Sequence, residues 1–530
     1  MRNPMRLCLA GLLLAFSSQL SHVHSSSSPP AVDSVGTLAA RIDHHVNRGL
    51  EIAGVKPAPR GDDAEFMRRA YLDITGRIPR SREVYEFLGD KSPDKRRKLV
   101  DDLLARPRYV THFTNVWRAL WIPETAANPR ARYFQPGFEA WLRERIRANV
   151  GYDCLVRELL TTPISNDPAQ TQPVLVKPGA PNPLAFFAVK DGKPENLAAA
   201  SARLFLGVQI ECAQCHDHPF ARWQREQFWS QAAFFAGIER QGDSLFNPLR
   251  EDLGRRELGL PNSNRKVSAA FLDQSGLHLP PMKSPRIALA NWITAADNPF
   301  FAKAAVNRVW SRFFGVGIVE PVDDFNNANK PSHPELLDEL ARAFVQAKFD
   351  IRFLVRAICA SEAYQRTSAV TDASQNNPRL FARMNVKGLT GEQLFDSLAL
   401  AIGYRDQDSA HRPFEINRGT PRSEFLSKFG GGEAQTSVRQ ALTLMNGSLL
   451  AEATSPERSE SLSAIIAMPS MKTAERIEAM FVATLGRKPT SNELELLVGH
   501  VEGVSKSDQT ERLADVFWAL LNSAEFRFNH

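Results

Sequence analysis

Leu72-Asp73-Ile74-Thr75-Gly76-Arg77-Ile78-Pro79-Arg80-Ser81-Arg82-Glu83 contains the end of one predicted helix and the beginning of the next. We expect Gly76 to end the first helix, because glycine adopts the left-handed backbone conformation without strain. Pro79 fixes the turn, and Ser81 is expected to cap the second helix. The stretch therefore predicts a corner between two helices.

The same signals return near the other end of the chain, in Gly486-Arg487-Lys488-Pro489-Thr490-Ser491-Asn492-Glu493. One interpretation is an internal repeat. The other is two unrelated corners that use the same common cap residues. Both interpretations concern architecture and indicate no site.

Apolar residues recur with helical spacing along most of the chain after Val35. The positions that carry this pattern are Ile42, Val46, Leu50, Ile52, Leu99, Val100, Leu103, Leu104, Trp117, Leu120, Phe138, Trp141 and Ile146. Further helices are predicted over 195–208, 286–294, 302–314, 334–347 and 351–360. Prolines and glycines predict irregular passages over 162–194 and 241–285.

These patterns predict a mainly α, multi-helical two-domain protein with long irregular Pro-rich connections. The expected N-terminal helical domain covers 39–240, a linker covers 241–283, and a C-terminal helical domain covers 284–530. The chain has 530 residues, of which 43% are hydrophobic and 23% charged, as in globular proteins. The net charge of +6 is spread thinly, so we expect no nucleic-acid partner. Oligomeric state is not indicated.

The first residues resemble a secretory signal peptide. Arg2 and Arg6 begin it, an apolar run covers Leu7 to Phe16, and a Ser-rich stretch follows. We place the signal peptide over 1–24. The apolar run is too short to cross a bilayer, and we expect no transmembrane segment after it. This predicts export, to the periplasm or the cell surface.

Cys212-Ala213-Gln214-Cys215-His216 is a Cys-x-x-Cys-His motif, the attachment signature of c-type haem. The spacing suits this chemistry, because two thiols one helical turn apart can reach the two vinyl groups of one haem edge. His216 would then be the proximal iron ligand. Covalently bound haem c is therefore the predicted cofactor.

Other cofactors remain open at this motif. Asp217 could orient a neighbouring imidazole, and His218 could be an additional ligand. Cys212, Cys215, His216 and His218 would together form a ligand set for zinc or non-haem iron, although the usual second Cys or His pair is missing. A redox disulfide between Cys212 and Cys215 is the third alternative.

Three residues are candidates for a distal iron ligand, each with a simpler interpretation. His333 lies in Ser332-His333-Pro334-Glu335, which fits a capping box, and His112 lies in an aromatic helix where core packing is favoured. Met282 is a lone methionine in a predicted loop. The amide-rich loop Asp323–Asn327 is expected to be solvated, with contact to a cation or a sugar as the alternative.

Two sets of motifs resemble known families. The first comprises Leu204-Phe205-Leu206-Gly207-Val208-Gln209, Cys212 to Phe220 and Leu103-Leu104-Ala105-Arg106-Pro107. The second comprises Arg286 to Ile293, Val306-Asn307-Arg308-Val309-Trp310, Ser332 to Asp338, Ala441 to Asn446 and the ending Asn522 to His530. Together they resemble the planctomycete cytochrome-c-associated family, in which domain of unknown function 1549 precedes domain of unknown function 1553. The resemblance implies no established reaction.

We therefore expect an exported c-type haem protein in periplasmic electron transfer or oxidoreduction, with an unidentified redox partner. An open sixth iron position would make it a haem-dependent oxidoreductase, and a filled one a carrier. The alternatives are a non-haem metal protein and a cell-surface binding or scaffold protein in which the Cys/His cluster staples the fold.

Overall fold

The computed structural model describes residues 34–530 apart from 166, 168–173, 176, 178, 220, 276, 278–282, 405–420 and 430–453. The predicted signal peptide, Met282 and the 441–446 motif lie outside the described residues. Within the described ranges, no helix has the length and apolar character needed to cross a membrane.

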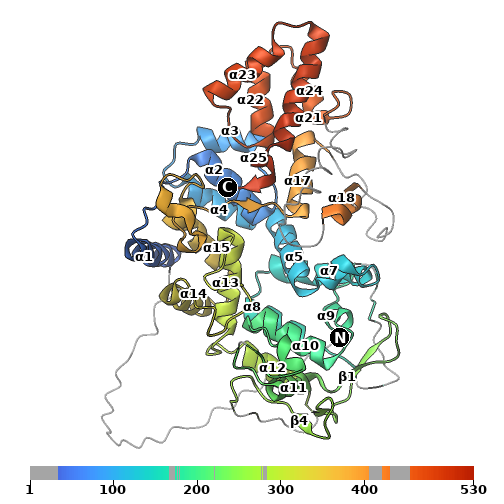
Figure 1. Cartoon of the computed structure of the whole chain (residues 1–530). Helices are drawn as coiled ribbons and strands as arrows, with labels where there is room; N and C mark the ends of the chain where they lie inside the picture. The colour runs from blue at the N-terminus through green and yellow to red at the C-terminus, as the bar shows by residue number, and fades with distance from the viewer. Residues whose placement is uncertain are drawn as a thin grey trace, which may run out of the picture. The chain divides into compact units, whose positions relative to one another are not determined.

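Helices dominate the described chain, which confirms the mainly α prediction (Figure 1). The α-helices before residue 240 are α1 (Val35–Ala53), α2 (Asp63–Thr75), α3 (Ser81–Gly89), α4 (Lys95–Ala105), α5 (Pro107–Trp121), α6 (Glu124–Ala127), α7 (Gln135–Arg147), α8 (Tyr152–Leu160), α9 (Ala185–Val189), α10 (Pro194–Ser201) and α11 (Arg225–Ala232). Shorter helical turns between them are η1 (Ala131–Phe134), η3 (Ala202–Leu206), η4 (Glu211–Gln214) and η5 (Ala233–Phe235).

The later helices agree closely with the sequence prediction for 286–360. They are α12 (Pro285–Ile293), α13 (Phe301–Phe314), α14 (Pro334–Gln346), α15 (Ile351–Ala360), α16 (Glu362–Gln365), η6 (Ala373–Asn376), η7 (Pro378–Leu380), α17 (Gly391–Ile402), α18 (Pro421–Phe429), α21 (Glu460–Ala467), α22 (Thr473–Thr484), α23 (Ser491–Val501), α24 (Lys506–Asn522) and α25 (Ala524–Arg527). Among the positions quoted for the apolar pattern, Ile52 of α1 is the one that is exposed, at 80%, since it lies two residues after buried Leu50 and so on the other side of the helix.

Strands in the described residues form three antiparallel pairs. They are β1 (Ile238–Arg240) with β2 (Leu249–Glu251), β3 (Glu257–Gly259) with β4 (Lys266–Ser268), and β5 (Lys387–Gly388) with β6 (Phe528–Asn529). The passage 241–285 was expected to be irregular, yet it contains β2, β3 and β4. Strands of three residues are too short for an alternating pattern to appear in the sequence.

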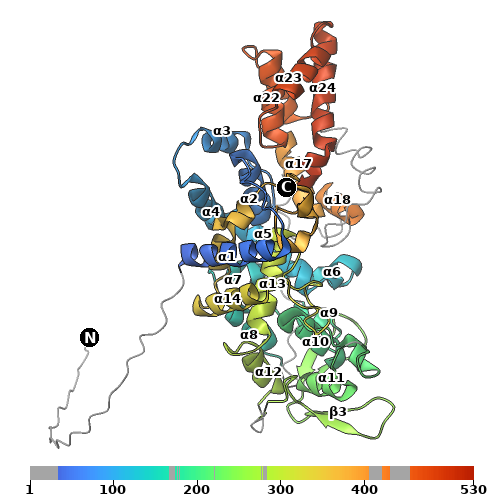
Figure 2. The same ribbon diagram turned by 60° about the vertical axis from the view of Figure 1, so that its left-hand side comes forward.

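Buried apolar residues gather in two clusters. The larger cluster draws on α1, α2, α5, α7 and α8, and equally on α12 to α15, so residues of both predicted domains share it. The smaller one, here called the C-terminal core, is built mainly from α17, α22 and α24 and also includes Leu72 and Ile78 of the first corner. Helices α22, α23 and α24 lie side by side in Figure 1 and Figure 2. The domain boundaries stay a prediction.

The two similar corners lie against each other. Gly76 and Gly486 both have left-handed backbones, with φ of 73° and 75°. A Cβ atom on Gly486 would be 3.4 Å from Cγ of Pro79 in the first corner. The expected caps are wrong by one residue, because Arg80 and Thr490 precede the helices and the serines are the first helical residues. Glu83 and Glu493 cause this shift by accepting the backbone N–H of Arg80 and of Thr490.

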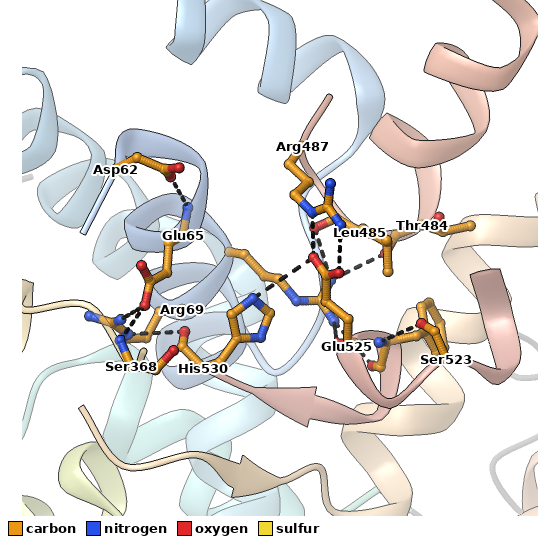
Figure 3. A network of polar contacts seen from close by, with 12 residues as sticks. Asp62, Glu65, Arg69, Ser368, Thr484, Leu485, Arg487, Ser523, Glu525 and His530 are labelled. Carbon is orange, nitrogen blue, oxygen red and sulfur yellow. Dashed lines mark hydrogen bonds and ion pairs between the residues drawn. The ribbon is translucent and has the colours of Figure 1, made fainter. Parts of the chain in front are cut away.

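Two arginines of α2 bind the last residues of the chain, and Figure 3 shows Arg69 beside Glu65 and His530. Arg69 donates to the backbone oxygen of His530 at 3.1 Å and to Glu65 at 2.7 Å. Arg68 is 1% exposed and donates to the carbonyl oxygens of Thr484, Leu485, Glu525 and Phe526. Burial without a directly bonded carboxylate lowers the pKa of Arg68 to about 10.

One buried carboxylate joins three distant segments. Asp73, at the end of α2, accepts hydrogen bonds from Lys387 Nζ at 2.7 Å, Tyr364 Oη at 2.8 Å and Asn529 Nδ2 at 2.8 Å. Lys387 also donates to the carbonyl oxygens of Arg312 and Phe313, the last turn of α13. Asp73 therefore fixes the positions of α2, α13 and the β5–β6 pair together.

Removing the cation beside Asp73 should destabilise the protein strongly. Lys387→Met should lower the free energy of unfolding by roughly 3–5 kcal/mol, because it leaves a buried carboxylate without its cation. Asp73→Asn in the same chain should restore part of this loss. The control is Lys303→Met, in an exposed pair with Asp338, and it should change stability by less than about 1 kcal/mol. Urea unfolding measures the wild type, the two single lysine variants and the double variant. Equal effects of Lys387→Met and Lys303→Met would contradict a structural role of the Asp73–Lys387 pair.

Gly76 should tolerate a side chain less well than another left-handed glycine. A Cβ at Gly76 would lie 2.3 Å from Nδ1 of His112, whereas nothing lies within 4 Å of the corresponding position at Gly54. Gly54→Ala should cost about 1–2 kcal/mol from backbone strain alone. Gly76→Ala should cost roughly 1–3 kcal/mol more because His112 must move. Chemical denaturation compares them, and similar losses would show that the corner relaxes freely.

Candidate functional site

The Cys-x-x-Cys-His motif forms an exposed turn. It begins in η4, after a left-handed Gly207 (φ 66°) ends η3. The thiols of Cys212 and Cys215 are free and exposed, and His216 is exposed beside them. Ala213 between the two cysteines is fully buried and fixes the turn to the core. The turn therefore exposes the side chains of Cys212, Cys215 and His216 to solvent, while Ala213 anchors it in the core.

Local hydrogen bonds fix the conformation of this turn. Trp229 donates its indole N–H to the carbonyl oxygen of Gln214 at 3.0 Å. The backbone N–H of Arg225 donates to Asp217 Oδ1 at 2.8 Å, and that of Ala221 donates to His218 Nδ1 at 3.0 Å. Both predicted accessory residues, Asp217 and His218, thus make contacts that shape the loop.

His216 has its two ring nitrogens in different situations. Nδ1 lies 2.7 Å from the carbonyl oxygen of Asp217. A carbonyl oxygen can only accept, so Nδ1 carries the proton and donates. Nε2 then carries the lone pair, which is the arrangement found in metal-binding histidines whose other nitrogen donates to a carbonyl.

The four predicted ligands of a zinc or non-haem iron site are close in sequence. Among the described residues, no three His, Cys, Asp or Glu side chains are grouped so that they could hold a metal ion. Cys212, Cys215, His216 and His218 would have to move to enclose one. Covalent attachment of haem requires two accessible thiols and one imidazole, and the turn presents these three groups.

A cavity of about 240 Å³ lies beside this turn. Its lining residues are Ala221, Arg222, Trp223, Phe300, Val319, Phe325, Asn326, Asn327, Asn329 and Pro331. They come from the segment just after the motif, from the residue that precedes α13 and from the loop 319–331. Sequence reasoning missed this cavity because nothing in the spacing links Arg222 to residues a hundred positions later.

The loop 319–331 is docked on the segment that precedes the motif. The backbone N–H of Phe325 donates to the carbonyl oxygen of Gly207 at 2.8 Å. Asp323 accepts from Arg203 at 2.6 Å and from Gln209 at 3.0 Å, and the Arg203 hydrogen bond is the main stabilising cause that keeps the pKa of Asp323 lowered despite burial. The expectation of a solvated loop is therefore wrong for Asp323, because its carboxylate is committed to protein donors.

The other two predicted histidines lie in other parts of the fold. His112, in α5, contacts Gly76 and has Nε2 3.0 Å from Arg312 Nη2; burial lowers its pKa well below the usual value. His333 lies against Gly49 of α1 and the ring of Phe381. The predicted capping box is wrong, because His333 itself precedes α14 and Ser332 donates to Ile318.

Comparison with known proteins agrees with the order of the two segments. Residues 41–240 match the family model described as PSCyt2, protein of unknown function (DUF1549). Residues 285–428 match the one described as PSD1, protein of unknown function (DUF1553). No curated protein and no solved structure matches the chain.

His333 should make the protein less stable in acid. Burial lowers its pKa to about 4 from the ordinary 6.5, so the unfolded chain binds a proton that the folded chain excludes. The free energy of unfolding is therefore highest above pH 6.5, and the effect of His333 lowers it by up to about 3 kcal/mol as the pH falls toward 4. Urea unfolding of His333→Leu should show a smaller loss over this interval than wild type. The control His44→Gln, on the exposed face of α1, should retain the wild-type slope, and an unchanged slope in His333→Leu would contradict the assignment.

Proposed function

Because the chain belongs to the family in which a DUF1549 segment precedes a DUF1553 segment, and this description names no reaction, we propose a function from the Cys-x-x-Cys-His turn. The protein is an exported c-type haem protein that works in electron transfer or oxidoreduction. The observation that carries the proposal is the turn itself, with two free, exposed thiols beside an imidazole whose Nε2 carries the lone pair.

Each residue of the turn has a defined part. Cys212 and Cys215 would form the thioether bonds, and His216 would provide Nε2 as the proximal ligand. The hydrogen bond from Nδ1 of His216 to the Asp217 carbonyl holds the imidazole in one tautomer and one orientation. When bound, haem supplies a one-electron carrier. Trp229 and buried Ala213 hold the turn in place while its thiols stay accessible.

Exposure of the motif is consistent with a protein redox partner. Cys212, Cys215 and His216 lie at the surface, so a partner can approach them without a large opening of the fold. Export to the periplasm or cell surface belongs to the same proposal, since the basic and apolar start of the sequence is typical of a signal peptide.

Covalent haem is tested by production in a host with c-type cytochrome maturation. Wild type should stain for haem on a denaturing gel and give a pyridine haemochrome spectrum with one haem per chain. The double variant Cys212→Ser/Cys215→Ser should be colourless, because no thiol remains for attachment. Cys154→Ser is the matched control, since Cys154 is also free and exposed but lies on α8. This variant should retain haem, and the thermal melting temperature should show that all variants fold.

Two results would overturn the proposal. One is a colourless wild type produced beside a control cytochrome that matures normally. The other is a Soret band that survives denaturation in the double cysteine variant. Metal analysis and thiol titration of a colourless protein would then separate a zinc or iron site from a dithiol.

A further inference from the structure

The cavity beside the motif combines an apolar wall with unused polar groups. Trp223 is 4% exposed, and Phe300 and Phe325 are half-buried. Phe300 and Phe325 provide the apolar surface that a ligand can cover, whereas Trp223 and Val319 line the cavity but expose very little surface. Aromatic walls of this kind favour a flat or ring-shaped ligand with one apolar face.

Arg222 supplies a positive charge at the edge of this wall. Its guanidinium carbon lies 5.0 Å from the centre of the Trp223 ring. In the part of the chain that the structure describes, Arg222 has no hydrogen bond or ion pair with another residue. A guanidinium that is positioned by a ring and keeps its donors unused is suited to a carboxylate, which it can bind with two parallel hydrogen bonds.

Three amide side chains also line the cavity, and the loop that carries them is held by its own hydrogen bonds. Asn326 and Asn329 donate to Asp324 at 2.7 and 2.6 Å, while the Asn326 oxygen accepts the backbone N–H groups of Ala328 and Asn329. These bonds fix the loop without a ligand. Asn327 is exposed, and its amide has no partner among the described residues, so it can donate to and accept from hydroxyl groups.

The volume of the cavity limits the size of the ligand that it can hold. The cavity of about 240 Å³ lies below the roughly 300 Å³ at which pockets for drug-sized ligands begin. A nucleotide or a folded peptide segment exceeds it, and no group of metal ligands is present among the described residues. We propose that the cavity binds one acidic sugar ring, with the apolar face of the ring on the aromatic wall, its carboxylate on Arg222 and its hydroxyl groups on Asn327.

The proposal is tested with D-galacturonate as the acidic probe and D-galactose as its neutral counterpart. Isothermal titration of the whole exported chain should give saturable, millimolar binding of galacturonate and about tenfold weaker binding of galactose, because a charge-assisted hydrogen bond is lost. Arg222→Gln should weaken galacturonate binding about tenfold and leave galactose binding unchanged. Arg130→Gln, an exposed arginine away from the cavity, should behave as wild type.

Further variants separate this site from the motif. Asn327→Ala should weaken both sugars, and Cys212→Ser/Cys215→Ser should bind them as wild type does, since the cavity does not depend on haem. Absence of saturable binding up to about 10 mM, tenfold above the expected affinity, would overturn the proposal. Equal affinity for the two sugars, or tighter binding of a mononucleotide than of galacturonate, would do the same.

Discussion

The buried carboxylate of Asp73 is the constraint on which the rest of the fold depends. A buried charge must be paired and hydrogen-bonded, or its desolvation costs several kcal/mol. Its partners are Tyr364, Lys387 and Asn529, which no local structure brings near α2. The chain satisfies Asp73 only when both halves are folded together. Arg68 and Arg69 on the same helix add bonds to the same distant segments, so α2 joins the larger cluster to the C-terminal core.

The conformation of the exposed Cys-x-x-Cys-His turn depends on support from the backbone beneath it. Three side chains that face solvent cannot be positioned by packing on both sides, so their geometry has to come from the backbone beneath them. Ala213 and the bond from Trp229 to Gln214 provide that support. Gly207 contributes by allowing close approach of Phe325, since a Cβ there would lie 2.7 Å from the Phe325 ring. The segment before the motif is thereby fixed by the loop 319–331.

Sequence reasoning located what depends on neighbouring residues. Helical spacing and caps placed α12 to α15 within a residue or two, and the motif was visible because its five positions are consecutive. It could not give what depends on distant contacts. The cavity is such a case, because Arg222 and Asn327 line it together. The hydrogen bond from His216 to the Asp217 carbonyl joins neighbours, but it depends on a turn conformation that the sequence does not specify. The capping box at Ser332 failed because of a distant contact, since Ile318 competes for its hydroxyl.

The segment that follows the Cys-x-x-Cys-His motif also lines the cavity, so hydrogen bonds of His218 connect the two. His218 accepts the N–H of Ala221 at its ring and donates its own backbone N–H to Trp223 at 2.8 Å. Both partners line the cavity, and His218 is two residues from His216. A ligand in the cavity contacts the loop in the conformation that these bonds define. The ligand can favour that conformation only if it binds it more tightly than it binds other conformations of the same loop.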